Sequence, residues 1–421
     1  FNAAHDIVIN NKIFDSTPSV GDVLNLSLIA GNNISLANDI SLGGGSATLT
    51  ATAGSITQTA GKLLSAGTLN ATAATGIGLN TAATLLNVVN TGATGNIAIT
   101  EADGATVQAL QQTNAANTAG TVSLTSATGN IGIADGSVLS QGGLVTLTAT
   151  AGAITDADGG TAASITNAGG QATLGAATGI GAVGVGNEID TQLGTLAFAN
   201  SGTGDVSVTN AGALAVSGTA GSGNVGITST TGNLAVGTSG IVTAGGAVTL
   251  KAAEADAGIT IGTGNTWRTI KGVATGANVS LIADNADVTG TIDAGTAGTV
   301  TILQSTAGRK ISLGSETSGQ LGLTGTEFDQ ITANTIVIGD ANSGDLGIFA
   351  AIAPAHAANL SLNTGGAISQ AAGATITVGT LTGSSVGATA LGEANQIGNL
   401  GSFTASSFSL TNAAPLTLVG D

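Results

Sequence analysis

Short runs in which aliphatic and small polar residues alternate recur along almost the whole chain. Residues 122–124 read Val-Ser-Leu, and residues 145–147 and 248–250 both read Val-Thr-Leu. Alternation over three to five positions is typical of a β-strand with one buried face, and Val, Ile and Leu separated by Thr or Ser suit a pleated, half-buried surface. Helix is disfavoured, because glycine costs about 1 kcal/mol per helix position relative to alanine and 68 of the 421 residues are glycine.

The strand-like runs restart at a fairly regular interval. Leu124 is followed by Leu147 after 23 positions, and Leu281 is followed by Ile302 after 21. Asp-Gly steps such as that at Gly136 supply the positive-φ corners between strands. Short strands, sharp corners and this period predict an all-β, right-handed parallel β-helix, because parallel crossovers are right-handed by default. At roughly 21 residues per turn the chain would make about 20 turns, stacked about 4.8 Å apart.

A longer repeat overlies the short one. Residues 54–69 and 366–381 share eight of their sixteen positions. We therefore expect residues 1–29 to form an entry or cap segment and residues 30–421 to form one continuous array of coils, itself a segment of a longer chain. One coil cannot bury its own apolar face, so stacking on neighbours must stabilise the array.

Composition excludes several classes of function. The chain has 7 Lys and Arg against 24 Asp and Glu, a net charge of −17, and so few cations cannot neutralise a track of nucleic-acid phosphates. The absence of Cys excludes a disulfide scaffold. No 18 consecutive residues are apolar, so we do not expect the chain to be embedded in a membrane. Two His, no Tyr and scattered cations offer neither a nucleophilic triad nor a lyase site, and we expect no enzyme.

Calcium is the best of the metal hypotheses. Pairs of acidic residues two positions apart lie beside turn residues, and calcium takes six to eight oxygen ligands. The pairs are Glu101 and Asp103, Asp156 and Asp158, and Glu254 and Asp256. The stronger interpretation is that these are solvated turn acids, so we expect no cofactor.

A single aromatic–basic cluster is the candidate for sugar binding. Trp267 is the only Trp of the chain and precedes Arg268. An indole can stack on a sugar ring, but it can equally cover a hydrophobic seam under a loop. These two residues are therefore the weak candidate for a glycan contact.

Threonine runs at 48–52 and 146–150 place hydroxyl groups on one face of a strand. Ice-binding solenoids array threonines in this way. We do not expect these runs to recur on successive coils, so outward threonines are interpreted as serving solubility and strand propensity.

The repeat phrases resemble those of the filamentous haemagglutinin-like exoproteins of bacterial two-partner secretion. Residues 143–154 (Gly-Leu-Val-Thr-Leu-Thr-Ala-Thr-Ala-Gly-Ala-Ile) and residues 45–56 (Gly-Ser-Ala-Thr-Leu-Thr-Ala-Thr-Ala-Gly-Ser-Ile) carry the resemblance, which covers about residues 30–421. It implies a secreted or cell-surface bacterial protein that is exported through an outer-membrane transporter. The Asn-Pro-Asn motifs of the family's secretion domain are absent, and the family offers no catalytic residue to carry over.

From these observations we expect the structural rod of an extracellular adhesin or fibre, which attaches to a surface glycan or cell receptor without catalysis. Self-association, end to end or side by side, fits this interpretation. A glycan-binding β-helix module is the alternative, and a polysaccharide-acting enzyme on the same fold is a weaker one.

Overall fold

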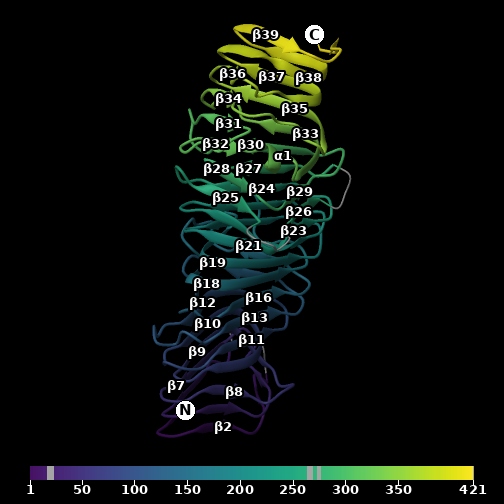
Figure 1. Ribbon diagram of the computed structural model, residues 1–421. Coiled ribbons are helices and arrows are strands. Elements are labelled where there is room, and N and C mark those ends of the chain that lie inside the picture. The colour runs from purple at the N-terminus through teal and green to yellow at the C-terminus, as the bar shows by residue number, and fades with distance from the viewer. Residues whose placement is uncertain (17–22, 263–268, 273–275, 421) are drawn as a thin grey trace. The chain divides into compact units, whose positions relative to one another are not determined.

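The chain folds as a β-solenoid (Figure 1). The computed structural model describes residues 1–16, 23–262, 269–272 and 276–420, and 56% of the chain lies in strands that are nearly all parallel. The predicted all-β, parallel β-helical class is confirmed. The expected count of about 20 turns was wrong, since the solenoid has about 17. Several turns are longer than 21 residues: Val248 pairs with Val279, 31 positions later, and Val300 pairs with Ile336, 36 positions later.

Two compact units divide the chain, and unit 1 is Phe1–Ala211. Its strands are β1 (Asn2–Ala3), β2 (Ile7–Ile9), β3 (Ile13–Phe14), β4 (Leu26–Ala30), β5 (Ile34–Leu36), β6 (Ile40–Ser41), β7 (Ser46–Ala51), β8 (Ile56–Gln58), β9 (Leu64–Ala73), β10 (Ile77–Asn90), β11 (Ile97–Glu101), β12 (Ala105–Gln112), β13 (Val122–Ser126), β14 (Ile131–Ile133), β15 (Val138–Leu139), β16 (Val145–Ala149), β17 (Ile154–Asp156), β18 (Ile165–Ala176), β19 (Ile189–Asn200) and β20 (Val206–Asn210).

Unit 2 is Gly212–Asp421. Its elements are β21 (Leu214–Ala220), β22 (Val225–Ser229), β23 (Leu234–Thr243), β24 (Val248–Ala252), β25 (Gly258–Ile261), β26 (Thr269–Gly272), β27 (Val279–Ile282), β28 (Asn285–Val288), β29 (Thr291–Asp293), β30 (Thr299–Leu303), β31 (Ile311–Leu313), β32 (Leu321–Leu323), α1 (Gly325–Phe328), β33 (Ile331–Ile338), β34 (Leu346–Ile348), β35 (Ala357–Thr364), β36 (Ile368–Gln370), β37 (Thr377–Ser385), β38 (Ala388–Thr404), β39 (Ser407–Asn412) and β40 (Thr417–Leu418). The helix α1 has four residues, and no helix within the described ranges is long and apolar enough to cross a membrane.

Aliphatic side chains stack inside the coils in register. In unit 1, Leu124 pairs with Leu147, Leu147 with Leu174, and Leu174 with Phe198 on successive coils. All four side chains are almost completely buried. Each coil thus covers the apolar side chains of the next coil. This is why the alternation of apolar and polar residues continues from turn to turn.

The register also aligns outward residues, although the threonine runs do not recur as runs: Thr146 and Thr148 pair with Thr173 and Gly175 on the next coil. Thr100 pairs with Thr125, and Thr125 pairs with Thr148, so one column of threonines runs across three successive coils. The column ends at Gly175, which pairs with Thr148. The sequence hides it because the turns between these coils differ in length.

The first residues of the chain already belong to the coils. Strands β1, β2 and β3 pair in parallel with β4, β5 and β6, and the register matches Ile7 with Ile34 and Ile13 with Ile40. The segment before residue 16 therefore uses the same strand pairing as the coil that follows it.

Candidate functional site

An insertion at residues 314–330 interrupts the regular coiling of unit 2. After β31 the chain turns back, and β32 pairs in parallel with β31 on the side opposite β34. The short helix α1 follows, and the chain then returns to the coil at β33. β32 lies against β28, whose backbone ladder among the described residues is with β25.

Glu327 joins the insertion to the edge of β28. Its carboxylate accepts a hydrogen bond from the backbone N–H of Val288 at 2.8 Å, so it replaces the carbonyl of a neighbouring strand. The same side chain accepts bonds from the N–H of Thr324 at 2.7 Å and from the Thr324 hydroxyl at 2.9 Å. Thr324 is the N-cap of α1, and the two residues form a capping box. Glu327 is buried, and these donors satisfy the oxygen atoms of its carboxylate.

Two neighbouring cavities open beside this junction. One, of about 590 Å³, is lined by residues of β28 and of the insertion: Asn285, Asp287, Val288, Thr289, Glu316, Thr324, Thr326, Glu327 and Gln330. The other, of about 610 Å³, is lined by Asp256, Asn285, Arg309, Glu316, Thr317, Ser318, Gly319 and Gln320. They share Asn285 and Glu316, and almost all of the lining side chains are polar. Both volumes lie in the range of small-molecule sites.

Two carboxyl groups of the first cavity have raised pKa values. Burial, followed by the charge of Glu327, raises the pKa of Glu316 to about 7. Burial and then the charge of Glu327 also raise the pKa of Asp287 above its usual value. The Glu316 carboxylate lies over the backbone of β32, where a Cβ on Gly322 would stand only 2.5 Å from Oε2. Glycine at this position therefore lets the side chain lie flat against the strand.

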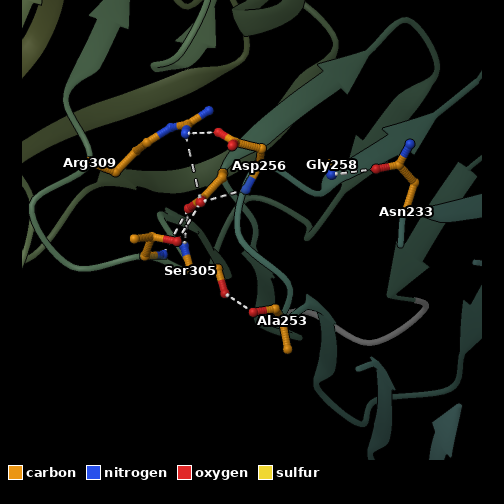
Figure 2. Close-up of polar contacts among 8 residues, drawn as sticks. Asn233, Ala253, Asp256, Gly258, Ser305 and Arg309 are labelled. Carbon is orange, nitrogen blue, oxygen red and sulfur yellow. Dashed lines mark hydrogen bonds and ion pairs between the residues drawn. The ribbon is translucent and has the colours of Figure 1, made fainter. Parts of the chain in front are cut away.

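A second polar cluster lies at the wall of the other cavity (Figure 2). Arg309 forms an ion pair with Asp256, and its Nη1 lies 3.8 Å from Oδ2 of Asp284. Asp284 is completely buried and accepts bonds from the N–H groups of Ser305 (3.0 Å) and Thr306 (2.7 Å). Burial would raise the pKa of Asp284, but the bonds from Thr306 and the charge of Arg309 hold it below its ordinary value. Asp284 is therefore an ionised anchor for Arg309.

Asp256 combines exposure with an unusual backbone. Its φ of 63° is the one positive value at a non-glycine residue in the described ranges, and its backbone N–H donates to Asp284 at 3.0 Å. Its side chain remains 78% exposed, whereas that of Arg309 is 13% exposed. The left-handed conformation costs free energy at most residues but is tolerated by Asp. It turns the Asp256 carboxylate toward Arg309 at the cavity wall.

The first calcium pair, Glu101 and Asp103, is split between the interior and the surface. Glu101 is completely buried, and its carboxylate accepts hydrogen bonds from the Thr81 hydroxyl (2.5 Å) and the Ala83 N–H (3.1 Å). Burial raises the pKa of Glu101 to about 7. Asp103 is exposed and lines a shallow cavity of about 420 Å³.

The second pair, Asp156 and Asp158, stays together in the turn after β17. Oδ1 of Asp156 accepts bonds from the N–H groups of Asp158 (3.1 Å) and Gly159 (3.3 Å). Oδ2 of Asp158 accepts a bond from the N–H of Asp135 at 3.0 Å, and this bond holds the pKa of Asp158 below its usual value. The carboxylate of Asp158 thus already accepts a backbone hydrogen bond. Oδ2 of Asp156, in contrast, is buried without a hydrogen-bond partner.

The proposed sugar contacts Trp267 and Arg268 lie outside the described residues. Across the described residues, no three acidic, His or Cys side chains stand where they could hold one metal ion together.

Sequence reasoning missed the residues that unit 2 gathers around its cavities. Arg309 was noticeable as part of the one adjacent cationic pair, Arg309-Lys310. Glu327 also had a readable signal, since a Thr three positions before a Glu is a capping-box pattern. Glu316 and Asp284 had none, because their partners come from distant positions in the chain.

Comparisons of the chain with protein-family models, with curated proteins and with solved structures give no match. The resemblance to filamentous haemagglutinin-like exoproteins accordingly depends on the repeat phrases alone.

Proposed function

We propose that the chain is a structural segment of a secreted bacterial surface adhesin or extracellular fibre and that it works without catalysis. The observation that carries the proposal is the in-register stacking of coils within each unit, as in the buried column from Leu124 to Phe198. Repeats that contact only their neighbours have a stability that is approximately the sum of coil and interface contributions. Many such repeats together present an extended surface. The repeat phrases shared with two-partner-secretion exoproteins support the surface role, and an outer-membrane transporter is the partner that the resemblance implies.

Electron microscopy of the purified chain tests the fibrous part of this proposal. Elongated particles or filaments are expected, and compact globular particles would contradict it. Beads coated with the chain test the adhesive part, because they should be retained on cells or on extracellular matrix more strongly than beads coated with albumin.

A second candidate function, glycan binding, is favoured by the two cavities that meet at Asn285 and Glu316. Hydroxyl, amide and carboxyl groups line them, and these are the groups that form hydrogen bonds with sugar hydroxyls. The excess of carboxylates disfavours acidic polysaccharides, so neutral or amine-bearing glycans are the expected ligands.

A glycan array compares three proteins. If the cavities bind sugar, Gln330→Ala should weaken the signal of the wild type at least several-fold, because it removes an amide from the cavity wall. Trp267→Ala should leave the signal unchanged, whereas it should abolish binding at the site expected from the sequence. Equal signals from all three proteins, or no binding, would reject both glycan sites.

A further inference from the structure

Three carboxyl groups line the first cavity of unit 2, and no cationic side chain stands among them. Asp287 comes from β28, and Glu316 and Glu327 come from the insertion. The other lining residues are uncharged, so no Lys, Arg or His of the described residues lines this cavity. Arg309 lies at the other cavity, in ion pairs of its own. The first cavity therefore carries an unbalanced negative charge whenever its carboxyl groups are ionised.

The three carboxyl groups differ in what they already bind. Both oxygen atoms of Glu327 accept hydrogen bonds, one from the N–H of Val288 and the other from Thr324. No N–H or hydroxyl group of the described residues donates to Asp287 or to Glu316. A bond between Glu316 and Glu327 forms only while one of the two carries a proton. Two carboxyl groups of the cavity thus have room for donors that a ligand can supply.

The volume and the spacing of these groups favour an organic ligand over a metal ion. The cavity measures about 590 Å³, which is in the range of small-molecule sites. In the part of the chain that the structure describes, no three acidic, His or Cys side chains stand close enough to hold one metal ion. An ammonium group on a larger ligand makes no such demand, because its N–H donors bond to carboxylates one by one.

An exposed aromatic ring lies on a strand beside the insertion. Gly322, Ser312 and Gly347 form one row across the adjacent strands β32, β31 and β34. Glu316 lies over Gly322 at one end of the row. The ring of Phe349 lies over Gly347 at the other end, where an added Cβ would stand 2.5 Å from ring atom Cε2. Phe349 is 47% exposed, and two strand spacings, about 10 Å, separate the ends of the row.

We propose that this face of unit 2 binds an amino-sugar oligosaccharide, with the ammonium group of one sugar at Glu316 and the apolar face of another sugar packed on Phe349. The inference rests on the candidate glycan-binding function and narrows its ligand class to amine-bearing sugars. Binding sites commonly combine aromatic contacts with a few well-placed polar groups. The ammonium group supplies donors to Glu316 and Asp287 and balances the charge of the cavity, whereas a neutral sugar leaves that charge unbalanced.

Isothermal titration calorimetry of the full chain at pH 7 with two matched tetrasaccharides tests the proposal. The probes are the β-1,4-linked tetramer of glucosamine and its N-acetylated form, which has the same sugar rings without the ammonium groups. The glucosamine tetramer is expected to bind at least about tenfold more tightly, because it alone forms charge-assisted hydrogen bonds with the carboxylates. Added NaCl should weaken its binding much more than that of the acetylated tetramer.

Two variants separate the contacts. Glu316→Gln removes the charge but keeps the shape of the side chain, so it should weaken binding of the glucosamine tetramer at least about tenfold and leave the acetylated tetramer unaffected. Phe349→Ala should weaken both tetramers by a similar factor, since it removes an apolar contact. Asp329→Asn is the matched control, because it removes one negative charge at an exposed position of the same insertion, outside both cavity linings. It should bind as the wild type does.

Equal affinity of the wild type for the two tetramers would overturn the preference for amines, while the glycan-binding function would stand. Unchanged binding of the glucosamine tetramer by Glu316→Gln would overturn the placement of the ammonium group, and unchanged binding by Phe349→Ala would overturn the aromatic contact. Absence of binding for both tetramers at millimolar concentrations would also overturn the inference, and the glycan array then decides separately whether the cavities bind another sugar.

Discussion

At the scale of single residues, buried polar side chains form hydrogen bonds between neighbouring coils. Thr81 and the N–H of Ala83 donate to Glu101 from the preceding coil. Asn210 accepts the equivalent pair of bonds from Thr191 and from a backbone N–H two residues later. A side-chain oxygen on one coil thus accepts hydrogen bonds from a hydroxyl group and a backbone N–H of the preceding coil. Asn does so as a neutral group, whereas Glu101 introduces a group that can ionise inside the solenoid.

Glu101→Gln should remove a pH dependence of stability. The pKa of Glu101 is about 7 in the folded chain, against an ordinary value of 4.5, so the folded state binds the proton more tightly than the unfolded state does. The wild type should therefore lose stability as the pH rises from about 4.5 to 7, by roughly 1–3 kcal/mol. The glutamine variant should not show this loss, since it stays neutral.

Denaturant unfolding at pH 5 and pH 8 measures the difference. Glu254→Gln is the control, because Glu254 is exposed and its replacement should leave the pH dependence of the wild type intact. An identical pH dependence in the wild type and in Glu101→Gln would show that Glu101 does not titrate in this range.

At the scale of elements, the insertion at residues 314–330 is a local rearrangement of strand order. It places β32 beside β31, and a side chain rather than a strand accepts the hydrogen bond of the Val288 N–H at the edge of β28. Glu327 supplies this acceptor and caps α1 with the same carboxylate. A helix of four residues has little stability of its own, so this carboxylate holds the cavity wall in place.

Glu327→Ala should destabilise unit 2 by about 1–3 kcal/mol, because the buried N–H of Val288 loses its acceptor. Hydrogen exchange at β28 and across residues 314–330 should accelerate, and equilibrium unfolding should register the loss. Thr326→Ala, at a neighbouring exposed position of α1, should change the stability by less than about 0.5 kcal/mol. Unchanged exchange at β28 in the Glu327 variant would contradict the bridging role.

At the scale of the whole molecule, each unit is a chain of nearest-neighbour contacts. The strand pairs connect each coil with the next, as β13 pairs with β16 and β16 pairs with β18. Stability in such an array is approximately a sum of coil and interface contributions, so damage should remain local.

Leu147→Ala tests this locality. Leu147 is completely buried between Leu124 and Leu174, and its truncation should cost about 2–5 kcal/mol. Hydrogen exchange should rise in β13, β16 and β18, whereas β4 and β7 of the same unit should keep the rates of the wild type. Uniform acceleration across unit 1 would show that the unit opens as one cooperative block.

The sequence by itself determined the solenoid class, because alternation and glycine-rich corners are local signals that repeat on every coil. It could also have identified α1 from Thr324 and Glu327, whose spacing is a local capping signal. The number of turns needed the tertiary structure, since turn lengths vary and decide which residues pair. The same variation decides that Glu327 bonds to the N–H of Val288, 39 positions earlier, and that Arg309 lies beside Asp284. Only the folded chain shows which carboxyl groups are buried and which backbone groups donate to them, because both depend on contacts between coils.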